Sequence, residues 1–214
     1  MFGKVINSIV KIIGKVHKRI KTAYASFSEV ETKTVQVRKE LEKMGLLFEN
    51  SRLSQVMVYY HFVFTEAAWA GWKRVMGFYF NGNIHIPAFW PPALSSKLSP
   101  MYCKRPLLDV IRHEFGHALE GKFYNVFHSG KLRERFLEAF GAPYGRRKVS
   151  REGDESNYVS EYARDMTQED FAETFMFYMK HKGRIPKKYM KSPAIRAKWK
   201  TVDAICKHIA QLKQ

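Results

Sequence analysis

The chain has 214 residues, of which 45% are hydrophobic and 14% aromatic, and its formal net charge at pH 7 is +17. This much apolar and aromatic surface supplies a substantial core and excludes a disordered or low-complexity protein. Every uninterrupted apolar stretch falls short of the roughly 18 residues that a membrane-spanning helix needs. The charge is concentrated at the two ends, because residues 1–28 carry six Lys or Arg and no acid, and residues 180–214 carry eleven against one acid.

The pattern of the N-terminal region predicts two helices. Apolar residues recur every three to four positions from residue 2 to residue 24, with lysines between them, which predicts a basic amphipathic helix. Such a helix either packs on the body with its lysines in solvent or contacts an anionic membrane or nucleic acid. The first alternative is favoured because surface helices have this pattern. Ser28 and Glu31 form a capping box that opens a second helix, which runs to about Met44 and stops at Gly45.

Three short strands are predicted in the middle of the chain. Residues 55–64 are rich in β-branched and aromatic side chains, and residues 77–87 contain two further strands around the pair Asn81-Gly82. An Asn-Gly pair is the strongest short hairpin signal, because both residues tolerate positive φ. Pro87 has no N–H to donate to a neighbouring strand, so it suggests that the second hairpin strand lies at a sheet edge.

The second half of the chain is predicted to be mainly helical. Periodicity and capping residues place four helices, from about Pro106 to Gly121, Lys131 to Phe140, Gln168 to Lys182 and Ser192 to Gln211. The polar, Gly-rich residues 141–157 predict a mobile loop, and residues 88–105 an irregular connection. The fold class expected is α+β, with a small antiparallel sheet packed on the helix at 106–121 and on the helix at 168–182, and with helical extensions at both ends.

One segment of the helix at 106–121 carries metal-binding chemistry. Residues 113–117 read H-E-F-G-H, an H-E-x-x-H motif. Its histidines, His113 and His117, are four residues apart on one helical face, so both imidazoles can reach one zinc ion at about 2 Å from each nitrogen. Glu114 lies beside that face, where a carboxylate can act as general base. Chance produces about 0.02 such motifs in a chain of this composition, so we predict one zinc ion per chain.

A catalytic zinc site also needs a third protein ligand and one open position. The metzincin pattern is excluded, because it requires a histidine where this chain has Phe123 and a glycine where it has Glu120. Glu169 and Glu173 are four residues apart on one helical face. One of the two carboxylates can bind the metal while the other accepts the free ring N–H of a ligating histidine. The remaining histidines considered as ligands are expected to be structural: His61, His85 and His128.

Together these residues resemble a known family. The H-E-F-G-H helix, followed at residues 162–173 by Y-A-x-x-x-x-x-E-D-F-A-E, is similar to the gluzincin zinc metallopeptidases, and most of all to the branch that contains the catalytic domain of anthrax lethal factor. The similarity covers residues 75–180, and it implies a gluzincin-like fold. By this resemblance the zinc ligands are His113, His117 and Glu169. Glu114 is then the general base, Tyr162 the hydrogen-bond donor to the transition state, and Glu173 the carboxylate behind a ligating histidine.

The predicted function is zinc-dependent hydrolysis of internal peptide bonds in a peptide or protein substrate. Four residues of the second hairpin strand are expected either to bind an extended substrate at an exposed sheet edge or to belong to an ordinary structural hairpin: Asn83, Ile84, His85 and Ile86. The alternative is a zinc-stabilised, non-catalytic binding module whose basic termini contact nucleic acid or an anionic membrane.

The expected organisation has three parts: basic amphipathic N-terminal helices at 1–50, a zinc metallopeptidase domain at 51–182 and a basic C-terminal helical tail at 183–214. Cys103 and Cys206 form no pair motif, which fits a reducing compartment. The N-terminus has no cleavable signal sequence, so the default location is the cytoplasm, with delivery to another compartment or cell as the alternative.

Overall fold

The structure is a computed structural model that describes residues 27–61, 77–87, 106–146, 155–164 and 166–212. The described chain is rich in helices and contains a small three-stranded mixed sheet, which is compatible with the α+β class. Three predicted features lie outside the described residues: the helix at 2–24, the connection at 88–105 and Cys103.

The helices are α2 (Phe27–Lys43), α4 (Leu107–Lys122), α5 (Tyr124–His128), α6 (Gly130–Phe140), α7 (Thr167–Lys180) and α8 (Pro193–Gln211). Short 3₁₀ turns occur at η1 (Glu155–Asn157), η2 (Tyr162–Arg164) and η3 (Lys187–Tyr189). The strands are β1 (Val58–His61), β2 (Phe78–Phe80) and β3 (Asn83–Pro87). The predicted helices in these regions are confirmed to within two residues at each end, whereas α5 is an addition to them.

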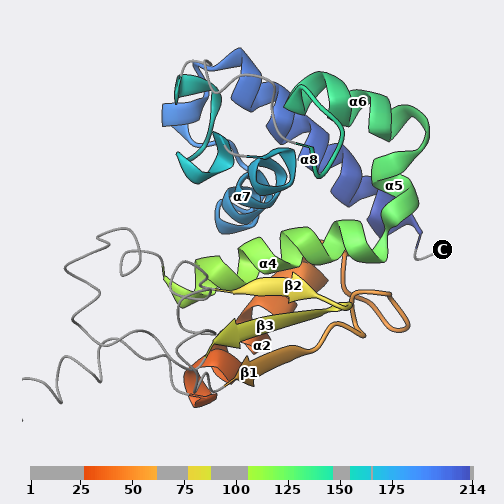
Figure 1. Ribbon diagram of the computed structural model, residues 1–214, viewed down its shortest axis with the longest axis vertical. Helices are drawn as coiled ribbons and strands as arrows, with labels where there is room; N and C mark the ends of the chain where they lie inside the picture. The colour runs from red at the N-terminus through yellow and green to blue at the C-terminus, as the bar shows by residue number, and fades with distance from the viewer. Residues whose placement is uncertain (1–26, 62–76, 88–105, 147–154, 165, 213–214) are drawn as a thin grey trace, which may run out of the picture.

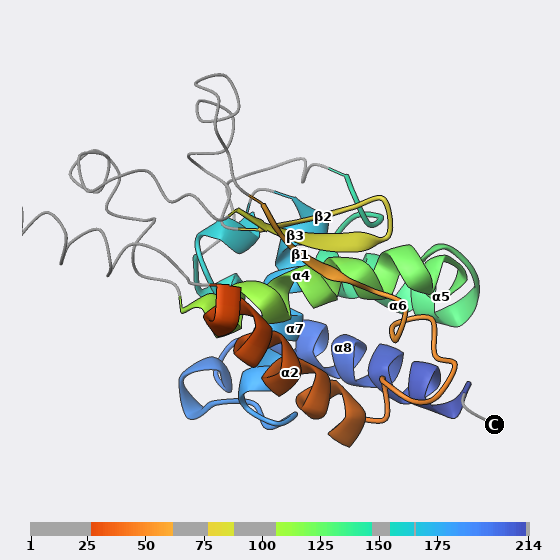
Figure 2. The same cartoon turned by 90° about the horizontal axis from the view of Figure 1, so that it is seen from below.

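The central element is α4. In Figure 1 the sheet lies on one side of α4, while α7 and α8 lie on the other. The sheet therefore packs on α4 as predicted, but the prediction that it also packs on the helix at 168–182 is wrong, because α4 lies between them. Figure 2, seen from below, shows α2 running across this assembly, where it packs against α4 and β1. Side chains of α2 and α8 join the same hydrophobic core as those of α4 and α7: Val30, Val37, Leu41, Val202, Ile205 and Ile209 are among them. Packing on both faces therefore holds α4, and the motif that it carries, in the interior.

The sheet is mixed, which corrects the prediction of an antiparallel one. β2 and β3 form the predicted hairpin, with Tyr79 opposite Ile84, and its turn has Asn81 at φ 47° and Gly82 at φ 80°. On its other side β3 pairs with β1 in parallel. A parallel pair needs a crossover of about a dozen residues or more, and residues 62–82 provide that length.

β3 is the central strand, in the order β1-β3-β2, so the substrate-docking edge predicted for it is wrong. The residues concerned are Asn83, Ile84, His85 and Ile86. Both sides of the β3 backbone are paired with neighbouring strands. Ile84 and Ile86 are fully buried in the core. His85 stacks on the rings of Tyr59 and Phe78, at centroid distances of 5.4 and 4.8 Å. Ile84 and His85 are paired on both sides, so these residues build the sheet and do not form an exposed edge.

α4 and α7 cross in close contact at Gly116. A Cβ atom added to Gly116 would lie 2.9 Å from the Cα atom of Ala172, closer than real Cβ contacts come. The glycine thus lets the two helix backbones approach each other between His113 and His117. This approach brings the first turns of α7 within reach of both imidazoles.

We expect Gly116→Ala to lower the free energy of unfolding by up to about 2 kcal/mol. Alanine favours a helix by about 1 kcal/mol over glycine, but an extra methyl group in a packed contact costs about 1–3 kcal/mol. Here the neighbouring atom belongs to the backbone and cannot rotate away, so the steric cost should win. Urea unfolding followed by circular dichroism measures the change, and Gly116→Val should lose more than Gly116→Ala. A stability equal to or above that of the wild type would contradict the close crossing.

A buried ion pair joins α8 to the first turn of α7. Lys198 Nζ lies 2.8 Å from Asp170 Oδ2, and the two side chains have exposed fractions of 5% and 0%. The same ammonium donates a hydrogen bond to the backbone oxygen of Asn157 at 2.8 Å. Burial lowers the pKa of Lys198 against the opposing effect of Asp170. Because Asp170 follows Glu169, the pair fixes the turn that presents Glu169.

We expect Lys198→Ala to lower the free energy of unfolding by about 3–5 kcal/mol, because removing one partner leaves the charge of Asp170 in the core. Lys200, two residues further along α8 and exposed, is the matched control, and Lys200→Ala should change stability by less than about 0.5 kcal/mol. Urea unfolding of Lys198→Ala and Lys200→Ala measures both free energies of unfolding. Similar, small losses in the two would show that the buried pair does not hold the helices together.

Candidate metal centre

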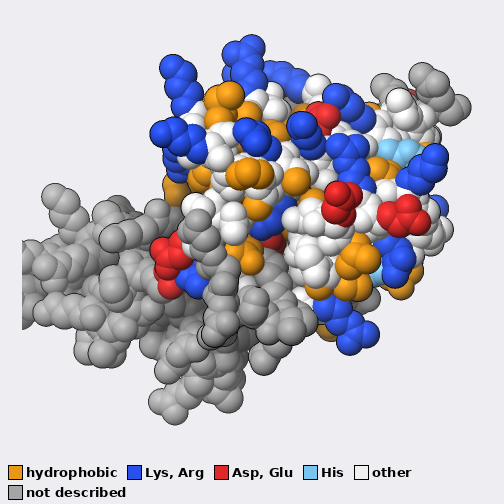
Figure 3. Space-filling model, turned by 90° about the horizontal axis from the view of Figure 1, so that it is seen from above, with side chains coloured by type: hydrophobic (Ala, Val, Ile, Leu, Met, Phe, Trp, Pro, Cys, Tyr) orange, Lys and Arg blue, Asp and Glu red, His pale blue; other side chains and the backbone are white. Residues whose placement is uncertain are grey.

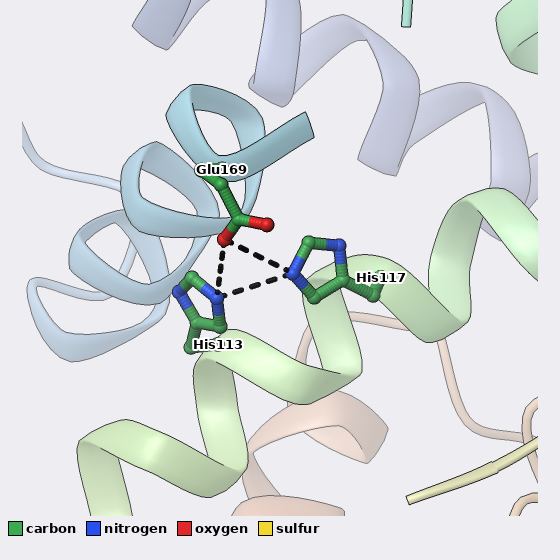
Figure 4. A group of neighbouring side chains, drawn as sticks. All are labelled: His113, His117 and Glu169. Atoms are coloured by element: carbon green, nitrogen blue, oxygen red, sulfur yellow. Dashed lines mark hydrogen bonds and ion pairs between the residues drawn. The ribbon is translucent and has the colours of Figure 1, made fainter. Parts of the chain in front are cut away.

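Three side chains from two helices converge on one point. His113 and His117 lie one turn apart on α4, and Glu169, in the first turn of α7, faces them (Figure 4). The two Nε2 atoms are 3.1 Å apart. Glu169 Oε2 lies 3.2 Å from the Nε2 atom of His113 and 3.5 Å from that of His117. The three residues therefore form a possible metal-binding triad with one donor atom each.

The separations of the three atoms fit a tetrahedral metal ion. Ligand atoms at about 2.0–2.1 Å from zinc stand about 3.3 Å apart in a tetrahedron, and the observed separations lie on both sides of that value. Glu169 Oε2 is buried, and its contacts with the two nitrogens do not have the geometry of normal hydrogen bonds. A cation shared by the three atoms would satisfy all of them. The residues present thus fit a metal ion with two nitrogen ligands and one oxygen ligand.

The charges of the centre favour an ionised carboxylate. Burial works to raise the pKa of Glu169, but the two imidazoles beside it outweigh burial and hold that pKa well below its usual value. Burial likewise works to lower the pKa of His113, but Glu169 and Glu173 outweigh it and raise the pKa of His113 to about 10. Without an ion, Glu169 is therefore ionised and His113 is protonated at neutral pH, and binding of a metal would release a proton from His113.

Glu173 supports His113 from behind. Its Oε1 atom lies 2.7 Å from His113 Nδ1, and its Oε2 atom accepts a hydrogen bond from Ser160 Oγ at 2.6 Å. The side chain is fully buried. Metal-binding histidines are commonly held through their second nitrogen in this way. Of the two carboxylates that the spacing on α7 left open, Glu169 faces the Nε2 atoms and Glu173 occupies the supporting position.

His117 has a partner that no spacing or motif in the sequence predicts. The hydroxyl oxygen of Tyr144 lies 3.0 Å from His117 Nδ1. Tyr144 belongs to the segment 141–157 that was predicted as a mobile loop, but its ring packs against the core next to Phe127 and Phe136. Burial raises the pKa of Tyr144 well above its usual value, so the hydroxyl is protonated at neutral pH. An aromatic residue within a polar, Gly-rich stretch was the one sequence signal for it.

Glu114 and Tyr162, the residues expected to act on substrate, lie close to the triad. Glu114 is only 4% exposed, and its Cγ atom lies 3.1 Å from the position of a Cβ atom on Gly77, just before β2. Its charge is near enough to raise the pKa of His113 and of Tyr162. The Tyr162 ring is 43% exposed, with its centroid 5.8 Å from that of His113. Partial burial and the carboxylate of Glu169 raise the pKa of Tyr162, so its hydroxyl keeps the proton that it can donate.

The other histidines considered as ligands are placed apart from the triad where the structure describes them. His128 lies 2.7 Å from a carboxylate oxygen of Glu120 and stacks on Tyr124 at a centroid distance of 4.0 Å. His85 stacks on aromatic rings of the sheet, and the side chain of His61 lies outside the described residues. Within the described part of the chain, the triad is the one group of three His, Cys, Asp or Glu donors close enough to share an ion.

Comparisons with known proteins found no match. No protein-family model matches the chain, no curated protein is significantly similar to it in sequence, and no solved structure significantly matches it. Among the helices of the described ranges, none has both the length and the apolar character needed to cross a bilayer.

Proposed function

We propose that the protein is a zinc-dependent endopeptidase of the gluzincin type. The observation that carries the proposal is the convergence of His113 Nε2, His117 Nε2 and Glu169 Oε2 at 3.1–3.5 Å from one another. Two imidazoles and one carboxylate are a ligand set of catalytic zinc sites that keep a fourth position open. Calcium and magnesium prefer ligand sets made of oxygen alone, so the donor atoms favour zinc.

The residues around the triad supply the remaining steps of a hydrolysis. A zinc ion held by His113, His117 and Glu169 would supply a Lewis acid and would lower the pKa of a water molecule to about 7. The Glu114 carboxylate takes a proton from the attacking water and returns it to the departing amine. Tyr162 keeps its own proton and donates a hydrogen bond to the carbonyl oxygen as negative charge grows there. One such donor is worth about 3 kcal/mol in the transition state.

Metal analysis of the full chain, paired with a peptide-library cleavage assay, tests the proposal. We expect about one zinc ion per chain and cleavage of internal peptide bonds. A chelator should abolish the cleavage, and added zinc should restore it. A protein that neither retains zinc nor cleaves any peptide of the library would contradict the proposal.

A second candidate function is a zinc-stabilised binding module that catalyses nothing. The observation in its favour is the segment 180–200, which holds nine Lys or Arg and no acid, all of them exposed except Lys198. Lys and Arg also outnumber Asp and Glu on the face seen in Figure 3. Such a surface fits nucleic acid or an anionic membrane, and binding of this kind weakens as the salt concentration rises. Bound zinc without cleavage, together with retention of DNA or anionic vesicles at physiological salt, would favour this candidate over the peptidase.

A further inference from the structure

The contact between Tyr144 and His117 is a part of the metal centre that the proposed hydrolysis does not use. We propose that Tyr144 is a positioning residue, whose hydroxyl oxygen accepts the Nδ1–H of His117 and so keeps His117 Nε2 unprotonated and directed at the metal. The inference rests on the proposed function to the extent that the triad must bind a metal ion. The contact distance that carries it is 3.0 Å.

The chemistry of imidazole gives this contact its meaning. A neutral imidazole has one N–H, and only the nitrogen without hydrogen can bind a metal. An acceptor at Nδ1 therefore selects the form in which Nε2 is free to bind. His113 has the same arrangement, with Glu173 as its acceptor at 2.7 Å. Both histidines thus have an oxygen atom beside Nδ1. The partner of His117 is a neutral phenol and not a carboxylate, so it adds no second negative charge.

The ring of Tyr144 is held firmly enough to aim its hydroxyl. It makes edge contacts with Phe127 and Phe171, at centroid distances of 5.5 and 6.0 Å. Phe136 packs against it as well, at 5.9 Å. These rings come from α5, α6 and α7, so the phenol is clamped from three helices. A side chain held in this way loses little conformational entropy when the metal binds.

The backbone around Tyr144 is tied to the helix that carries the third ligand. Thr167 Oγ1 donates a hydrogen bond to the carbonyl oxygen of Pro143 at 2.7 Å. Thr167 N donates to the carbonyl oxygen of Arg146 at 3.2 Å. Thr167 begins α7 two residues before Glu169. Residues 143–146 therefore form a strap that joins His117 on α4 to the turn that presents Glu169, and through it the two sides of the triad are braced together.

Tyr144→Phe tests the inference, with Tyr178→Phe as the matched control. Tyr178 lies on α7, nine residues beyond Glu169, and its hydroxyl donates a hydrogen bond of 2.8 Å to Asp203 Oδ1. Loss of this hydrogen bond should affect stability but not the metal centre. We expect Tyr144→Phe to weaken zinc binding about 10–100-fold in a chelator competition, and Tyr178→Phe to leave it unchanged. The visible spectrum of the cobalt(II)-substituted protein should shift in Tyr144→Phe alone.

The possible outcomes separate this inference from the function on which it rests. A wild-type protein that binds no zinc overturns both. If the wild type binds zinc and the zinc Kd of Tyr144→Phe lies within twofold of the wild-type Kd, the role of Tyr144 is overturned. The peptidase proposal is then left standing. If Tyr144→Phe does not fold, Thr167→Val is the test variant. Thr167→Val keeps the phenol of Tyr144 but removes the hydrogen bond from Thr167 Oγ1 to the strap. Thr167→Val should bind zinc several-fold more weakly than the wild type, and an unchanged Kd would overturn the inference.

Discussion

Glu114→Gln is expected to lower the rate of peptide hydrolysis at least about 1000-fold while the protein keeps its zinc. Glutamine matches the size of the buried glutamate but has no basic oxygen that can take a proton from water. The three donor atoms of the triad belong to other residues, so the metal site should stay intact. The loss should therefore appear in turnover and not in metal content.

Turnover of a cleaved library peptide and zinc content, measured on the same preparations, check this prediction. Glu120→Gln is the matched control, because Glu120 lies on the same helix and its carboxylate contacts His128 outside the triad. Wild-type activity is expected from Glu120→Gln. Full activity in Glu114→Gln would remove Glu114 from the mechanism, whereas equal losses in both variants would indicate damage to α4.

Glu169→Ala is expected to weaken zinc binding by about two to three orders of magnitude. Zinc sites with four ligands bind with about 10–16 kcal/mol, so that one ligand contributes about 2.5–4 kcal/mol, and each factor of ten corresponds to about 1.4 kcal/mol. The variant leaves the two Nε2 atoms in place but removes the oxygen that closes the triad on the α7 side. Chelator competition measures the change directly.

Tyr162→Phe provides the contrast, because its hydroxyl is expected to act on the transition state and not on the metal. Loss of one donor worth about 3 kcal/mol should lower turnover about 100-fold with an unchanged zinc Kd. Glu161→Gln, at the exposed neighbouring position, should match the wild type in both measurements. Equal zinc loss in Glu169→Ala and Tyr162→Phe would undo this division of roles.

The parts of the fold that could be predicted are those set by local periodicity. The helices appear where apolar spacing places them, and the Asn81-Gly82 turn forms the expected hairpin. Ser192 caps α8 by accepting a hydrogen bond from Ile195 N, whereas the residues that precede α6 and α7 make no side-chain cap hydrogen bond. The H-E-x-x-H motif belongs to the same class, because two histidines four residues apart on a helix must share a face. The spacing of residues on a helix also limits the third ligand to Glu169 or Glu173, but it does not choose between these two.

Strand order and the outer contacts of the centre could not be predicted in this way. Alternation of side chains shows that a segment is a strand but not which neighbour it pairs with, so the sequence suggested an edge for a strand that lies in the centre. Tyr144 is 27 residues from His117, in a segment without regular periodicity. Nothing in the spacing of these two residues marks them as neighbours.

By itself, then, the sequence determined the helices, the hairpin turn and a pair of imidazoles on one helical face, since each depends on residues within a few positions of one another. The tertiary structure decided which carboxylate faces the imidazoles, which supports them and which strand is enclosed. Those choices depend on how α4 and α7 cross at Gly116 and on how the three strands pair. Such contacts arise from packing between segments that are distant in the chain, so residue spacing cannot predict them.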